Sequence, residues 1–112
     1  MWCSGYRPDN RLGSTSLHIA ASRGFDDVVD ALLQLGAFPE PLNAAQETPL
    51  ALAARNGFPS VAIQLLDKGV DVNQLDGLGW TPLYHATAFC HGVMVELLLS
   101  RDADPLIRAY NG

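Results

Sequence analysis

The feature of this sequence that most constrains its fold is an internal repeat. The segments "TSLHIAASRGF", "TPLALAARNGF" and "TPLYHATAFCH" begin at Thr15, Thr48 and Thr81, 33 residues apart without a gap. The same offset aligns "DDVVDALLQLGA", "SVAIQLLDKGV" and "VMVELLLSRDA". After Ala103, "DPLIRAYNG" matches "DVNQLDGLG" of the repeat before it. A period of this length predicts a stack of small units, each burying its apolar face on its neighbours.

Each unit is predicted to hold two short antiparallel helices and a turn. Thr48 and Thr81 are each followed by proline, which is typical of an N-cap with proline at the first helical position. Gly24 and Gly57 suit a left-handed residue that ends the first helix. The second helices carry apolar residues at helical spacing, which predicts a buried stripe: Val28, Val29, Leu32 and Leu33; Val61, Ala62, Leu65 and Leu66; Met94, Val95, Leu98 and Leu99.

These residues resemble the ankyrin-repeat pattern, D-x-x-G-x-T-P-L-H-x-A-A followed by an apolar helix and G-A-D-V-N. The resemblance covers residues 10–112. It implies an all-α solenoid of stacked helix-turn-helix units joined by β-hairpin-like turns. The expected organisation is a tail over 1–9, ankyrin repeats over 10–42, 43–75 and 76–108, and the start of a fourth repeat over 109–112.

Composition limits the function. The net charge of −5 and the pI near 4.8 argue against nucleic-acid binding, which needs a basic surface. No apolar stretch approaches the roughly 20 residues that span a bilayer, so no membrane insertion is expected. The start "MWCSGYRPDN" lacks the apolar run of a signal peptide. Cys3 and Cys90 form no disulfide framework, so we expect an intracellular protein, cytoplasmic or nuclear.

Repeat 3 departs from the pattern. Cys90 replaces the glycine at the end of the first helix. Either Cys90 is left-handed, at a cost of about 1–2 kcal/mol, or Gly92 takes over that role. Asp102 replaces the glycine after the second helix, and aspartate tolerates left-handed geometry better. The resemblance also implies a histidine after Thr-x-Leu that fixes neighbouring turns, which only His18 supplies.

Catalysis and metal binding are not expected. His85, Cys90 and His91 include candidate zinc ligands, but they lie on one helix and its end, and no fourth ligand is evident. Cys90 and His91 make a weak catalytic dyad, because neighbours at a helix end diverge. No glycine-rich phosphate loop, paired-carboxylate site or Ser-His-Asp set stands out. The sequence therefore predicts neither an enzyme nor a cofactor.

In ankyrin-repeat proteins, partners contact the turn tips and the exposed side of the first helices. The resemblance therefore implies partner-binding positions at Arg11, Leu12, Ser14, Arg23, Glu47, Arg55, Asn56, Leu78, Trp80, Phe89 and Tyr110. Aromatic residues and arginine are enriched at interface hot spots. The aromatic residues of this set, together with Arg23 and Arg55, favour a peptide with an apolar anchor and an acidic residue. Alternatively, Trp80 and Phe89 cover the neighbouring turn or pack beneath a missing fourth repeat.

The resulting hypothesis is a non-enzymatic module that binds a partner protein or peptide in a concave groove. The alternative is the substrate-receptor or targeting fragment of a larger adaptor, such as a ubiquitin-ligase subunit. The last helices lack a polar outer face, so apolar surface should be exposed there and could support self-association. Asn73, eight residues after Leu65 and preceded by Asp71-Val72, resembles ankyrin asparagines that an intracellular oxygenase hydroxylates. A purely structural turn asparagine explains the same context.

Overall fold

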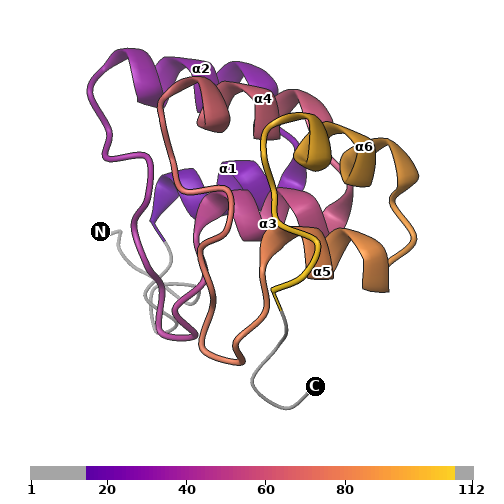
Figure 1. The fold of residues 1–112 in the computed structure, drawn as a ribbon. Coiled ribbons are helices and arrows are strands. Elements are labelled where there is room, and N and C mark those ends of the chain that lie inside the picture. The colour runs from indigo at the N-terminus through magenta and orange to yellow at the C-terminus, as the bar shows by residue number, and fades with distance from the viewer. Residues whose placement is uncertain (1–14, 108–112) are drawn as a thin grey trace.

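The computed structural model describes residues 15–107, which form six helices in three antiparallel pairs (Figure 1). No strand occurs within this range. The pairs are consecutive in the chain, and each predicted repeat contributes one pair, so the predicted all-α stack is confirmed. The helices are α1 (Ser16–Arg23) and α2 (Asp26–Gln34), α3 (Pro49–Asn56) and α4 (Pro59–Asp67), and α5 (Pro82–Ala88) and α6 (Gly92–Ser100).

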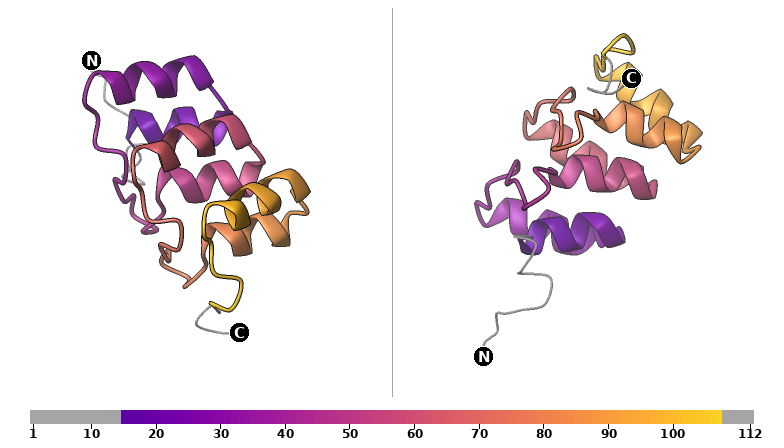
Figure 2. Two further views of the ribbon diagram at one scale, coloured as in Figure 1. Left: turned by 45° about the horizontal axis from the view of Figure 1, so that its top comes forward. Right: turned by 90° about the horizontal axis from the view of Figure 1, so that it is seen from below.

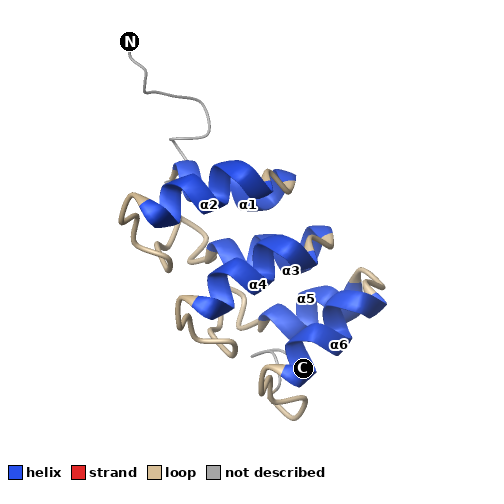
Figure 3. Cartoon of the chain, turned by 90° about the horizontal axis from the view of Figure 1, so that it is seen from above, coloured by secondary structure: helices blue, strands red, loops and turns tan. Residues whose placement is uncertain are grey.

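The helices form two layers. Helices α1, α3 and α5 lie side by side in an inner layer, and α2, α4 and α6 form an outer layer on top of it (Figures 1 and 3). The segments that join one pair to the next project together on one side of the stack (Figure 2). The core runs through all three pairs, and its fully buried side chains include Leu50, Val61, Leu65 and Leu98. Burial of this continuous apolar layer is what stabilises the repeats together.

Threonine caps begin the inner helices, as the sequence predicts. The hydroxyls of Thr15, Thr48 and Thr81 accept hydrogen bonds from the amides three residues later, at 3.2, 3.2 and 3.1 Å. Pro49 and Pro82 occupy the first helical position, where their missing N–H is not needed.

The connections contain tight hairpin turns. Asn43 N–H donates to Glu47 O at 3.2 Å, and Asp76 N–H donates to Trp80 O at 3.1 Å. The Oδ1 of Asn43, like that of Asp76, accepts from the amides two and four residues later. These side chains close the turns without strand pairing. The predicted hairpin-like turns are therefore present.

The prediction that the apolar stripe is buried throughout is wrong at the start of the stack, where Val28 in α2 is 45% exposed. At the other end Leu99 in α6 is 44% exposed, in line with the expectation that the last helices expose apolar surface. The equivalents of Val28 in the next repeats, Val61 and Met94, are buried because they face a preceding repeat. Leu99 lies on the opposite side of its repeat. The described residues therefore leave apolar side chains uncovered at both ends.

Cys90 keeps the left-handed conformation of the glycine it replaces, with φ of 62°. The helix end has the same hydrogen bond in repeats 2 and 3: Phe58 N–H donates to Ala53 O at 3.0 Å, and His91 N–H to Ala86 O at 2.9 Å. The alternative that Gly92 takes over is wrong, because Gly92 begins α6. Asp102 also has positive φ, 73°.

Candidate functional site

The exposed residues of the inner layer and the neighbouring hairpins form one candidate binding surface, which we call the inner surface. Arg23, Asn56 and Phe89 occupy equivalent positions at the ends of α1, α3 and α5, and all three are exposed. Leu78 is exposed at the tip of the last hairpin. The sequence prediction therefore selected solvent-exposed residues at these four positions.

Three aromatic residues mark the end of the inner surface that belongs to repeat 3. The ring centroids of Trp80 and Tyr84 are 4.5 Å apart in an edge-on arrangement. Tyr84 is 41% exposed, while Trp80 is half-buried. Phe89, at the other end of α5, is 51% exposed. Tyr84 was not among the predicted contacts, although its departure from the pattern histidine was a usable signal.

A buried hydrogen bond between two side chains holds the Trp80 hairpin on α5. His85 Nε2 donates to Asp76 Oδ2 at 2.8 Å, and both side chains are buried. The other carboxylate oxygen of Asp76 accepts from the amide of Trp80 at 3.0 Å. The indole of Trp80 in turn lies over the imidazole, with centroids 5.1 Å apart. The position of Trp80 is thus fixed before any partner binds. Sequence reasoning missed this pair, which links residues nine positions apart.

The two predicted cations differ in availability. Arg55 Nη1 lies 2.8 Å from Glu47 Oε2, so these two predicted contact residues bind each other. The other carboxylate oxygen of Glu47 accepts from Asn43 Nδ2 at 3.0 Å. Arg23 is exposed and forms no ion pair with any residue in 15–107. Asn56 Nδ2 donates to Ser22 O at 2.8 Å, so part of its hydrogen-bonding capacity is used between repeats.

His18 has the structural role that the resemblance implies. Its Nδ1 accepts from Thr15 N–H at 3.1 Å, and its Nε2 donates to Glu47 O at 2.7 Å, in the next hairpin. The ring is fully buried, and this burial lowers the pKa of His18 below 6.5. The neutral form is the one that both hydrogen bonds require.

The histidines near Cys90 are also used in packing. His85 binds Asp76, and His91 Nε2 donates to Arg55 O at 2.8 Å. Cys90 is an exposed free thiol. Residues 15–107 contain no group of three or more His, Cys, Asp or Glu side chains arranged to hold a metal ion.

Several predicted features fall outside residues 15–107: the tail over 1–9, the fourth-repeat start over 109–112, and the candidate contacts Arg11, Leu12, Ser14 and Tyr110. Within that range, no helix combines the length and the apolar character needed to cross a membrane.

Comparison with known proteins agrees with this architecture. A family model described as "Ankyrin repeats (3 copies)" matches residues 17–109. Among curated proteins, no sequence matches the chain. The matched range contains five helices in full, all of α1 except Ser16, and most of the chain. The chain therefore belongs to the ankyrin-repeat family.

Proposed function

We propose that this chain is a non-enzymatic protein-interaction module that binds a partner protein or peptide at the inner surface. Ankyrin repeats are in general protein–protein interaction modules. The observation that carries the choice of surface is the exposure of Phe89 and Tyr84 beside the half-buried Trp80. Aromatic side chains held in a fixed position bind at low entropic cost, because little freedom is lost.

The chemistry of the inner surface supports a partner with an apolar anchor and an acidic residue. Leu78, Trp80, Tyr84 and Phe89 offer apolar area in repeat 3. Arg23, at the opposite end of the inner layer, offers an exposed guanidinium for a carboxylate. Arg55 is a weaker candidate than the sequence suggested, since a partner would compete with Glu47. The alternative function, an intracellular adaptor that recruits the substrate of a ubiquitin ligase, would use the same surface.

Asn73 has a structural role that the hydroxylation hypothesis must accommodate. Its Oδ1 accepts from Asp104 N–H at 2.9 Å, and its own amide donates to Asp71 Oδ1 at 2.9 Å. The asparagine therefore joins repeat 2 to repeat 3. Hydroxylation of Asn73 stays a separate proposal, and it predicts a mass increase of one oxygen on the peptide that contains this residue.

The proposed function is tested by affinity capture with two double variants, one on each layer. The Trp80→Ala/Phe89→Ala double variant removes the aromatic end, and Leu35→Ala/Ile63→Ala removes exposed apolar side chains of the outer layer. Partners of the inner surface should be captured about tenfold less well by the first variant and equally well by the second. Circular dichroism checks that both keep their helices. Equal capture by a folded Trp80→Ala/Phe89→Ala variant would contradict the proposed site.

A further inference from the structure

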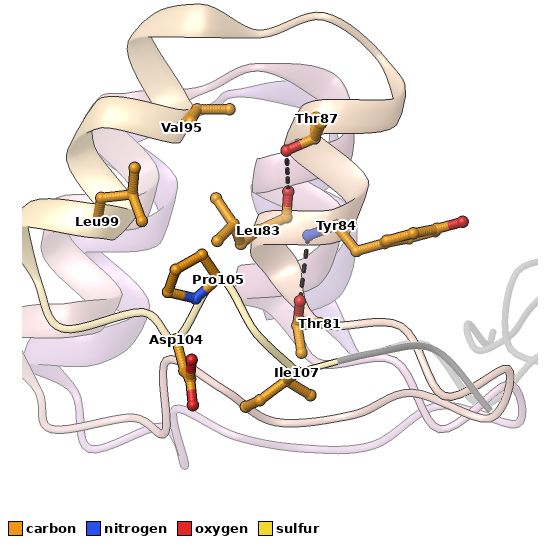
Figure 4. A pocket seen from close by; sticks show the side chains of 9 residues that line it. All are labelled: Thr81, Leu83, Tyr84, Thr87, Val95, Leu99, Asp104, Pro105 and Ile107. Atoms are coloured by element: carbon orange, nitrogen blue, oxygen red, sulfur yellow. Dashed lines mark hydrogen bonds between the residues drawn. The ribbon is translucent and has the colours of Figure 1, made fainter. Parts of the chain in front are cut away.

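The outer side of repeat 3 carries a second apolar surface, which we call the end face. Its side chains surround a hollow of about 270 Å³ between α5, α6 and the segment that follows: Leu83, Val95, Leu99, Asp104, Pro105 and Ile107 are among those that line it (Figure 4). Tyr84 also lines the hollow, but its ring points away from the other lining side chains (Figure 4). The end face therefore adjoins the inner surface at Tyr84, while Leu83, Val95 and Leu99 belong to the end face alone.

The end face occupies the position at which repeats 1 and 2 receive the repeat that follows them. Leu83 and Val95 are equivalent to Leu50 and Ala62 of repeat 2, both of which are fully buried in the core. Two helices, α5 and α6, pack against α3 and α4 in this way. A helix is accordingly the element whose shape fits the hollow between α5 and α6.

The end face lacks the space that the other junctions provide for an aromatic ring. A Cβ on Gly24 would come within 2.6 Å of the Phe58 ring, and a Cβ on Gly57 within 2.6 Å of the His91 ring. Each ring thus sits directly on the glycine of the preceding repeat. Cys90 holds this position in repeat 3 with the same left-handed backbone, and its side chain fills the space that a following ring would take.

A second junction contact is missing as well. The Glu40 carboxylate accepts from the amide of Asp71, and Asn73 Oδ1 accepts from the amide of Asp104. Leu106 holds the equivalent position in repeat 3, is 83% exposed, and has no side-chain acceptor. The end face is therefore not built to receive a unit like repeats 2 and 3.

The carboxylate that lines the end face is Asp104, and it is exposed. Glu96 in α6 and Asp102 just after it add two more exposed carboxylates close by in the sequence, whereas the Arg101 guanidinium lies 3.0 Å from Asp67 of the preceding repeat. Among residues 76–107, Arg101 is the only arginine or lysine. Carboxylates with no cation of their own favour a basic partner.

A second copy of the chain fits this surface poorly. Stacking head to tail would place the start of one α2 on the end face of the other copy. Asp26 and Asp27 would then approach the acidic rim, and Phe25, the equivalent of Phe58, would meet Cys90. Both effects oppose the contact, because like charges repel and the ring has no space.

We propose that the end face binds a basic amphipathic helix of a partner protein. The apolar side of that helix fills the hollow over Leu83, Val95 and Leu99, and its lysine or arginine residues face Glu96, Asp102 and Asp104. The end face shares only Tyr84 with the inner surface, and the residues named in this proposal do not belong to the inner surface. Failure of this proposal would leave the proposed function intact.

The test uses two designed amphipathic peptides of about five helical turns, with the same leucine stripe and either lysine or glutamate on the polar side. Peptide binding is measured by fluorescence anisotropy. Coverage of the face is measured by the rate at which Cys90 is alkylated, in a Cys3→Ser variant so that Cys90 is the single thiol. The lysine peptide should bind, weaken as salt rises, and slow alkylation. The glutamate peptide should not bind.

Matched variants locate the binding. Leu99→Gln should weaken binding of the lysine peptide about tenfold, while Ile63→Gln on α4 should leave it unchanged. Both side chains are partly exposed, so both variants should stay folded. Equal binding of the two peptides, or binding insensitive to Leu99→Gln, would overturn the proposal. A dimer in sedimentation that Leu99→Gln dissociates would assign the face to a second copy of the chain. Faster Cys90 alkylation after removal of residues 108–112 would assign the face to that segment. Either result overturns the proposal.

Discussion

The imidazole ring of His91 lies directly on Gly57, across the junction between repeats 2 and 3. A Cβ on Gly57 would come within 2.6 Å of the His91 Nδ1, and the φ of Gly57 is 77°. His91 Nε2 at the same time donates to Arg55 O at 2.8 Å. One residue of repeat 3 therefore covers the helix end of repeat 2 and caps one of its carbonyl groups. A side chain at Gly57 should weaken the packing of repeat 3 on repeat 2 and lower the free energy of unfolding.

Gly57→Ala should destabilise the protein by more than backbone strain alone. Gly36 also has positive φ, 91°, but a Cβ there meets nothing within 4 Å. Gly36→Ala should thus cost about 1–2 kcal/mol, and Gly57→Ala about 1–3 kcal/mol more because His91 must move. Urea unfolding monitored by circular dichroism measures both free energies. Equal losses in the two variants would mean that the ring does not couple the repeats.

Cys90→Gly should stabilise repeat 3. The left-handed backbone at φ 62° strains a cysteine by about 1–2 kcal/mol, whereas glycine adopts it freely. Glycine also loses more entropy on folding, so the net gain in the free energy of unfolding should be about 0.5–1 kcal/mol. Cys90→Ala is the control, since it removes the thiol but keeps the strain. A gain in the alanine variant as large as in the glycine variant would point to the thiol instead of the backbone.

Asp76→Ala should be among the most damaging single changes. It removes the acceptor for His85 and for two hairpin amides in a buried setting, which should cost about 3–5 kcal/mol. Asp76→Asn should cost less, since Asn43 closes the equivalent hairpin of repeat 2 with an amide side chain. Near-ultraviolet circular dichroism of Trp80 should also change in the alanine variant. A loss of less than about 1 kcal/mol would show that the hydrogen bonds of Asp76 do not hold the hairpin.

Acid should weaken the protein through His18. Because burial lowers its pKa in the folded chain below 6.5, the unfolded chain binds a proton first as pH falls. The His18 contribution to the free energy of unfolding is complete above about pH 6.5 and is lost as pH falls toward the folded-state pKa. His18→Gln removes this titration. The difference in unfolding free energy between wild type and His18→Gln should therefore shrink between pH 7.5 and 5. Parallel profiles would contradict this assignment.

The repeat made the helices predictable, because caps and apolar spacing are local signals. Thr48, Pro49 and Gly57 specify one helix almost completely. Side-chain pairings between elements were not predictable in the same way. The Arg55–Glu47 and His85–Asp76 pairs depend on how a hairpin folds back on a helix, which the period leaves open.

The ends of the stack show a second limit of sequence reasoning. Val28 has the same helical spacing as its buried equivalents Val61 and Met94, and Leu99 has the same spacing as Leu33 and Leu66, which are less exposed. Within the described residues, neither Val28 nor Leu99 has a neighbouring repeat on its exposed side. That difference depends on the position of a repeat in the stack and not on its local sequence. The backbone of Cys90 shows a local limit of the same reasoning. The sequence allowed either Cys90 or Gly92 to be left-handed, because the choice depends on how the helix ends.

The most direct test of the central claim is site-specific photo-crosslinking. A benzophenone amino acid replaces Phe89 on the inner surface or, as the control, Ile63 on the outer layer, and adducts formed in cell lysate are identified by mass spectrometry. The account predicts a discrete protein adduct at position 89 that disappears when Trp80→Ala is added, and no such adduct at position 63. An adduct of the same protein from position 63, or one at position 89 that persists without Trp80, would contradict recognition at the aromatic end of the inner surface.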